Sequence, residues 1–159
     1  MIEIRQSKTA DTRSCDFAKV SKDTLYASSE QHIQDVRRAL EFFAAKIGEA
    51  AERHDRDKLT DIDSFHADFI TGFKQTAWWD RHRQLNRHHL QQADGVPSDV
   101  NLIDVLDMIA DSVMAGMART GTVYPLNIDP ELLARAFQNT VELLKQQVVV
   151  VVDPPEMTR

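Results

Sequence analysis

Apolar residues recur at intervals of three and four along most of the chain, and this period constrains the fold more than any other feature of the sequence. The clearest stretch begins at Ser28, which can cap a helix with Gln31 three residues further on. The apolar side chains that follow share one helical face: Ile33, Val36, Leu40, Phe43, Ala44 and Ile47. The spacing predicts a helix over residues 29–47, with Gly48 as its break or C-cap.

The same period continues beyond this stretch. It predicts a helix after Ser64, a second over residues 77–92, a long one from Ser98 to near Gly121, and a last one that begins at Asp129-Pro130. The sequence therefore predicts an all-α protein, a single domain of five or six helices.

Both ends of the chain depart from the helical pattern. Residues 1–27 are polar and irregular, although residues 1–4 alternate as in a short strand, and Val148–Val152 is a run of five valines. Because β-branched residues favour an extended backbone, the valines either pair with residues 1–4 or add to the edge of another subunit, which would give a homodimer. We expect an irregular segment over residues 1–27, a helical domain over residues 28–147, and an extended tail over residues 148–159.

Composition excludes several classes of protein. The 159 residues carry 19 basic and 25 acidic side chains, a net charge of −6, which argues against general binding to duplex nucleic acid. The sequence has no apolar run of membrane-spanning length, and its first residues lack the apolar stretch of a signal peptide. Cys15 is the only cysteine, so neither an internal disulfide nor a Cys-rich zinc cluster can form. We expect a cytoplasmic protein.

Histidine and aspartate supply the candidate metal ligands. His54 and Asp55 are adjacent, so that an imidazole and a carboxylate can reach one divalent ion. His32 falls on the apolar stripe of the first helix, where it is either a ligand or a core histidine bonded to a carbonyl. Asp111 lies one helical turn after Asp107, among apolar neighbours that make an unpaired carboxylate costly.

The segment from Trp78 to His89 holds three histidines and three arginines within nine residues. It is either an exposed polar helix with two aromatic anchors or a wall of donors that faces a phosphate or carboxylate. On a helix, His88 and His89 would point about 100° apart and could not easily bind one ion.

These residues resemble a known pattern. The order His32, His54-Asp55, Asp111 is similar to the H…HD…D order of the HD superfamily of metal-dependent phosphohydrolases. The similarity is closer to short HD-like proteins of phages and bacteria, which carry HD-x-S-K, W…H…N-x-H-H and A-D segments. It covers residues 29–118, about half of the chain. Asp57 departs from this pattern, because the group usually has Ser there.

The resemblance implies a role for each matching residue. The implied metal ligands are His32, His54, Asp55 and Asp111, with Asp107 orienting a ligand or a water. Such a nitrogen and oxygen donor set suits Mn, Co, Fe, Ni or Zn. The implied catalytic residues are Asp55, Lys58, His88 and His89. The implied substrate-binding residues are Lys58, His82, Asn86, Arg87, His88 and His89, where His88 and His89 bind phosphate, protonate the leaving oxygen or hold a second ion.

A shared site sets a geometric condition on the chain. In one straight helix His32 and His54 would stand about 33 Å apart. The six residues after Gly48 reach about 20 Å when extended, which is just enough to bring His54 back. A metal site that contains both histidines therefore requires a reversal of the chain near Gly48.

The function implied by the resemblance is hydrolysis of a small phosphorylated molecule, most simply a nucleotide, by in-line attack of activated water on phosphorus. The alternative is a catalytically silent helical module that binds a nucleotide or a partner protein. In a third interpretation the protein is a plain helical bundle and its histidines form no site.

Overall fold

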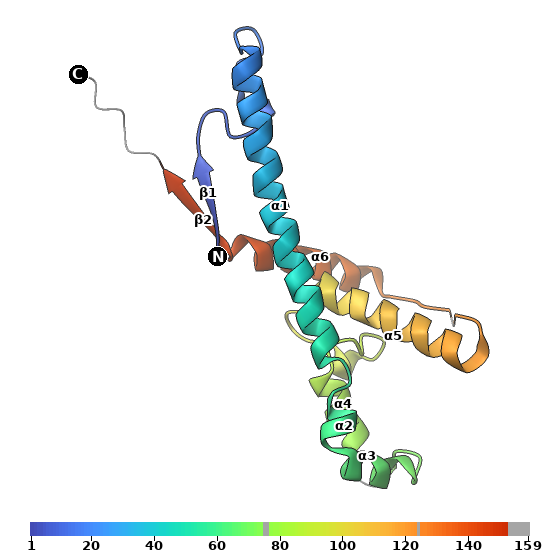
Figure 1. Ribbon diagram of the computed structural model, residues 1–159. Coiled ribbons are helices and arrows are strands. Elements are labelled where there is room, and N and C mark those ends of the chain that lie inside the picture. Colours follow the sequence, from blue (N-terminus) through green and yellow to red (C-terminus); the bar gives the residue numbers. More distant parts are fainter. Residues whose placement is uncertain (75–76, 124, 153–159) are drawn as a thin grey trace. The chain divides into compact units, whose positions relative to one another are not determined.

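The computed structural model describes residues 1–74, 77–123 and 125–152, and it is mostly helical with one pair of terminal strands (Figure 1). This confirms the predicted all-α class with a short extended segment. In chain order the elements are β1 (Ile2–Gln6), η1 (Thr12–Ser14), α1 (Lys22–Arg53), α2 (Asp57–Thr60), α3 (Ile62–Phe69), α4 (Trp78–Leu85), η2 (Ala93–Gly95), α5 (Leu102–Thr120), α6 (Pro130–Lys145) and β2 (Val148–Val152). They divide into two compact units: the first comprises residues 1–44 and the described residues from Leu143 onward, and the second comprises residues 45–142.

In the first unit the two terminal strands pair with each other. β1 and β2 run parallel, with Ile2 opposite Val148 and Gln6 opposite Val152, and Figure 1 shows the two arrows side by side. The first of the two alternatives for the valine run is therefore the one observed. The side-chain amide of Gln31 on α1 donates to the Arg5 carbonyl at 3.0 Å, which ties this sheet to the helix.

Helix α1 begins earlier and ends later than the sequence predicts. Its first turn is capped by Ser21, whose Oγ accepts a hydrogen bond from the Thr24 N–H at 3.1 Å. Ser28, the expected cap, is instead buried inside the helix, where the Cys15 thiol lies 3.8 Å from its hydroxyl. Gly48 does not break the helix, which continues to Arg53. A glycine inside a helix costs about 1 kcal/mol, too little to end one of this length.

The second unit has a core between α5, α6 and the loop before α5. Its buried apolar residues are Leu90, Val100, Val105, Met108, Leu132 and Ala136. α5 starts at a capping box of Asn101 and Asp104 rather than at Ser98, and it ends as predicted at Gly121, whose φ is +72°. α6 begins as predicted, because Asp129 caps it by accepting from the Glu131 N–H at 3.0 Å.

Helix α4 is shorter than the predicted 77–92 segment. It ends at Leu85, and Asn86 has the extended angles φ −98° and ψ 111°. The Asn86 side chain favours this exit, because its amide donates to the His82 carbonyl at 3.0 Å and competes with continued helix. Residues 86–90 consequently form a loop, and this loop carries His88 and His89.

None of the helices within the described residues combines the length and apolar character needed to cross a bilayer.

Candidate metal centre

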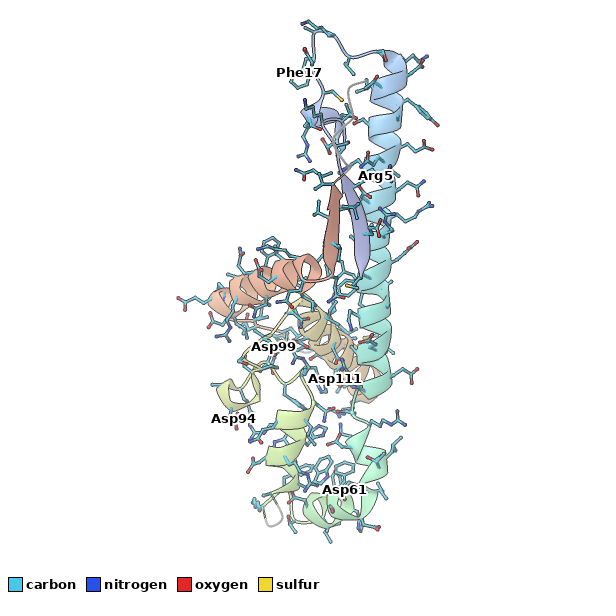
Figure 2. The ribbon with its side chains drawn as sticks, turned by 90° about the vertical axis from the view of Figure 1, so that its left-hand side faces the viewer. Arg5, Phe17, Asp61, Asp94, Asp99 and Asp111 are labelled. Carbon is cyan, nitrogen blue, oxygen red and sulfur yellow. The ribbon has the colours of Figure 1, made fainter. Side chains whose placement is uncertain are left out.

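Histidine and aspartate side chains gather in the second unit at the end of α1, on α4, on the loop after α4 and on α5. Three overlapping groups have ligand atoms within 4.8 Å of one another, and Asp111, which belongs to one of them, is labelled on α5 in Figure 2. The first group is Asp55, His82, His88 and His89, the second is His54, His88 and Asp107, and the third is His54, Asp55 and Asp111. The three groups together form what we call the His/Asp cluster, which could hold a metal ion.

The turn after α1 presents His54 and Asp55 to this cluster. Asp55 adopts a left-handed backbone conformation, with φ at +53°, which is unfavourable for a residue with a side chain. Its N–H donates to Oδ1 of Asn86 at 3.0 Å, so the loop after α4 holds the turn in place. This contact explains how an ordinary helix end produces a fixed position for the Asp55 carboxylate.

His82 is almost completely buried on α4, and both of its ring nitrogens face carboxylates. Nδ1 lies 2.8 Å from Oδ2 of Asp57, and Nε2 lies 3.3 Å from Oδ1 of Asp55. Burial lowers the pKa of His82 despite the nearby Asp57. Asp57 therefore orients a neutral imidazole whose Nε2 lone pair is directed at Asp55.

His54 is oriented in the same way from α5. Its Nδ1 lies 2.7 Å from Oδ1 of Asp107, as expected for an orienting carboxylate. Its Nε2 lies 3.5 Å from Oδ2 of Asp55 and 3.8 Å from Oδ1 of Asp111. One imidazole nitrogen thus bonds to a supporting aspartate, while the other meets two carboxylates that could share an ion with it.

His88 and His89 both enter the first group, although helical geometry predicted that they could not share an ion. That expectation assumed a helix through residue 92, whereas α4 ends at Leu85, before either histidine. His88 is 3% exposed, with Nε2 at 3.6 Å from Oδ1 of Asp55. Burial, reinforced by the neighbouring His88 and His82, lowers the pKa of His89 to about 4.

Buried polar atoms in the first group have no hydrogen-bond partner among the described residues. They are Asp55 Oδ1, His82 Nε2, His88 Nδ1 and His89 Nε2. Buried polar atoms are rarely left unpaired, because each costs free energy comparable to a lost hydrogen bond. A divalent cation with nitrogen and oxygen ligands would satisfy several of them at once. The residues present therefore fit a metal site.

The protonation states fit as well. Burial by itself raises the pKa of Asp55, but the hydrogen bond from Lys58 and the nearby His54 and His88 outweigh it and hold the pKa below its usual value. The pKa of Asp107 is lowered against burial in the same way, by His88 and His54. At neutral pH the cluster thus has ionised carboxylates together with neutral His82 and His89, which are the forms that bind metal ions.

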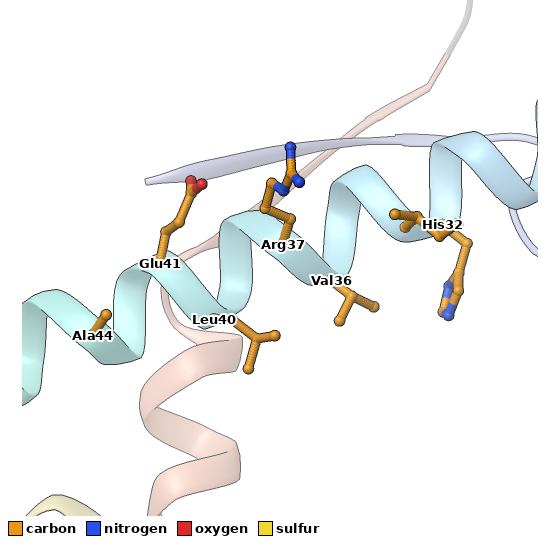
Figure 3. Close-up of a pocket in the computed structure, with 7 residues that line it drawn as sticks. His32, Val36, Arg37, Leu40, Glu41 and Ala44 are labelled. Atoms are coloured by element: carbon orange, nitrogen blue, oxygen red, sulfur yellow. The ribbon is translucent and has the colours of Figure 1, made fainter.

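His32 is not a member of the three groups. It lies in the first unit, where its Nδ1 is 3.1 Å from Oδ2 of Asp11. Figure 3 shows His32, Val36 and Leu40 projecting from one side of α1, where they line a shallow apolar groove. The expected apolar stripe is therefore present. The ligand role depended on a reversal near Gly48, however, and α1 runs unbroken through that residue.

Among the residues expected to bind substrate, Arg87 is held by carboxylates outside the three ligand groups. Arg87 forms a two-pronged ion pair with Asp104, at 2.7 and 2.9 Å, and also contacts Asp99 at 2.9 Å. The pKa of Arg87 is raised, chiefly by the hydrogen bond to Asp104. The guanidinium of Arg87 is therefore engaged with Asp104 and Asp99.

Asn86 is buried and holds the turn and the orienting carboxylate. It accepts from the Asp55 N–H, and its amide donates to Oδ1 of Asp57 at 2.9 Å. Lys58 hydrogen-bonds to Oδ2 of Asp55 and remains partly exposed. Of these residues, Lys58 offers the cationic group nearest to the candidate ligands.

Sequence reasoning missed two features of the site. Asp57 was noted only as a departure from the HD-like pattern, and its contact with His82 was not foreseen. His82 was assigned to substrate, yet its position one turn after Trp78 buries it. Trp78 itself is buried and stacks on His82 at a ring-centroid distance of 4.7 Å.

No model of a known protein family, no characterised protein and no solved structure matches this chain.

Proposed function

We propose that this protein is a metal-dependent phosphohydrolase that acts on a small phosphorylated molecule. The observation that carries the proposal is the convergence of ligand atoms from Asp55, His82, His88 and His89, several of which are buried and unpaired. The third group, His54, Asp55 and Asp111, adjoins this set, and its Asp111 is 37% exposed at the side chain. A buried set of ligands beside a more open one suits a centre that must also admit a substrate.

The proposed ligands differ from those implied by the HD resemblance. His54, Asp55 and Asp111 keep that role, and His82, His88 and His89 join them in place of His32. Since Asp55 belongs to both groups, the cluster can hold two ions that share its carboxylate. This favours the third of the roles expected for His88 and His89, which is to hold a second ion.

In the proposed chemistry, the metal ion activates water and phosphate, and the side chains position the ligands and attract the substrate. When bound, a divalent ion supplies Lewis acidity, which lowers the pKa of water and withdraws charge from phosphate oxygens. Asp107 and Asp57 fix the rings of His54 and His82, so that their free nitrogens stay aimed at the centre. Lys58, next to Asp55, supplies a positive charge that attracts an anionic phosphate.

The substrate class follows from charge and from the resemblance. A net charge of −6 disfavours a long polyanion, whereas a single phosphate group needs only local positive charge. Among small phosphorylated molecules, the resemblance to HD phosphohydrolases favours nucleotides.

The test starts with metal content. Protein purified without a histidine tag is analysed by mass spectrometry for bound Mn, Fe, Co, Ni and Zn. It is then screened against nucleotides and simple phosphate esters with each ion. We expect phosphate release that is lost with a chelator, is restored by Mn or Co, and falls at least a hundredfold in the Asp55→Asn protein.

A matched control is Asp63→Asn, because Asp63 is an exposed carboxylate on α3 outside the His/Asp cluster. It should retain full activity. Equal activity in the Asp55→Asn protein and in wild type would refute the proposal. Nucleotide binding without turnover across all the ions would instead identify the silent binding module.

A further inference from the structure

A groove of about 430 Å³ opens beside the His/Asp cluster within the second unit. At its polar part lie His54, Asp107 and Asp111. Its apolar part is lined by Ala51, in the last turn of α1, and by Ala110, Met114 and Ala115 on α5. The groove thus combines two members of a candidate ligand group with a wall of small apolar side chains.

We infer that this groove binds the organic group of the phosphorylated substrate, and that this group presents the apolar face of a flat ring, such as a nucleobase, to the groove wall. The inference rests on the proposed function, since the phosphate must lie at the cluster for its substituent to reach the groove. His54 and Asp111 belong both to the third ligand group and to the lining of the groove. A phosphate held there can direct its ester substituent into this groove.

The size and lining of the groove suit a ring. Pockets for small molecules have volumes of roughly 300–1,000 Å³ and are mainly apolar, with a few polar groups that fix orientation. The three alanines leave space for a flat group, and Met114, which is 69% exposed, can adapt to its edge.

The other hollows next to the cluster are less suitable. One has a volume of about 170 Å³, and its lining includes Arg83, His88 and His89 beside Trp79 and Met108. Another has a volume of about 100 Å³ and includes Arg53 and Arg87. Both are smaller than a typical ligand site and would leave charged groups against an apolar ring. The groove lined by Ala110 and Met114 is the one that fits the ring.

The test uses binding rather than turnover. Phenylphosphonate and methylphosphonate carry the same anionic group but cannot be hydrolysed as esters, and they differ only in the organic substituent. Calorimetric titration of the Mn-loaded protein should give an affinity for phenylphosphonate at least tenfold above that for methylphosphonate, because the ring is removed from water.

Two variants locate the ring. Ala110→Leu fills the groove and should reduce the preference to within about threefold, with the affinity for methylphosphonate unchanged. Met114→Ser removes an exposed wall residue and should reduce the preference in part. Ala134→Leu is the matched control for Ala110→Leu, because Ala134 is exposed on α6 and does not line the groove. It should leave the preference intact.

The outcomes separate the groove from the proposed activity. Equal affinity for the two phosphonates in wild type, or binding of neither, would overturn the inference even if phosphate esters are hydrolysed. A preference that survives Ala110→Leu in folded protein would overturn it as well. A preference that Ala110→Leu abolishes, in a protein that hydrolyses no ester tested, would support the groove while refuting the hydrolase.

Discussion

Oδ2 of Asp57 lies 2.8 Å from Nδ1 of His82, and this contact determines which nitrogen of the buried imidazole is available to a metal ion. The other oxygen of Asp57 accepts from the Asn86 amide at 2.9 Å, so the carboxylate cannot easily rotate away. Position 57 is where the chain departs from the HD-like pattern, and the departure supplies a partner for a histidine. Supporting carboxylates of this kind strengthen a ligand without touching the ion.

We therefore predict that Asp57→Asn lowers metal affinity by about 10–100-fold, the usual effect of losing a supporting carboxylate. The amide can still accept one hydrogen bond but no longer carries the negative charge that makes the ring a stronger ligand. Competition titration with a chromogenic chelator measures the effect, and Asp63→Asn serves as the control. Unchanged affinity in the Asp57→Asn protein would show that Asp57 is structural only.

A second prediction separates the histidines of the His/Asp cluster from His32. His89→Gln removes a candidate ligand and should lower the bound metal per chain at least twofold after dialysis. His32→Gln should leave the metal content unchanged, because His32 pairs with Asp11 in the first unit. Mass spectrometry of both variants and wild type makes the comparison. Metal loss in the His32→Gln protein would restore the ligand set implied by the resemblance.

The helical class and the ends of some helices could be predicted from sequence, because they depend on local chemistry. Gly121 ends α5 in a left-handed conformation, and Asp129 with Pro130 starts α6, as the residue types require. The limits of α1 could not be predicted in this way. Gly48 permits a break in the helix without requiring one. Ser28 could not act as the cap because it lies inside α1, where it contacts Cys15 of the segment before the helix.

For the candidate site, sequence identified the residue types but not their grouping. His54, Asp55 and Asp111 do come together, because α5 faces the turn after α1. His88 and His89 were treated as helical, and only the hydrogen bond from the Asn86 side chain to the His82 carbonyl reveals that the chain leaves the helix first. The contacts of Asn86 with Asp55 and Asp57, which fix its side chain there, join distant parts of the chain and are not signalled by a single sequence.

The third prediction concerns pH. The pKa of His89 falls to about 4, from an ordinary value of 6.5, so between these values the unfolded chain binds a proton that the folded chain does not. The stability of the metal-free protein therefore rises with pH across this window and falls on acidification. His82, whose pKa burial also lowers, acts in the same direction.

From pH 7.5 to pH 5 we expect a loss of about 2 kcal/mol at most from His89, since one pKa unit corresponds to about 1.4 kcal/mol. Urea unfolding of chelator-treated protein at both values measures this. His89→Gln should reduce the difference between the two pH values. A variant with the same pH dependence as wild type would mean that His89 does not titrate as the burial implies.

The fourth prediction tests the structural role of Arg87. Its guanidinium meets a nearly buried Asp104, which also caps α5 by accepting from the Asn101 N–H at 2.9 Å. Arg87→Met leaves that carboxylate without its main partner and should lower the free energy of unfolding by about 2 kcal/mol. Metal affinity should change less than threefold. Loss of phosphonate binding at unchanged stability would instead favour the substrate-binding role.

The last prediction concerns the loop that carries His89. Gly95 in η2 packs so closely on this loop that a Cβ atom there would lie 2.5 Å from the His89 carbonyl oxygen and 3.2 Å from its Cβ. Gly95→Ala must therefore displace backbone, and we expect a loss of about 1–3 kcal/mol in stability together with weaker metal binding.

Gly48→Ala is the matched control, because a Cβ at Gly48 meets nothing within 4 Å inside α1. The same substitution there should raise stability by up to about 1 kcal/mol. Urea unfolding and chelator competition on both variants complete the comparison. Two results would show that metal affinity does not depend on the position of the His89 loop. One is weaker metal binding by the Gly48→Ala protein, and the other is unchanged metal binding by a destabilised Gly95→Ala protein.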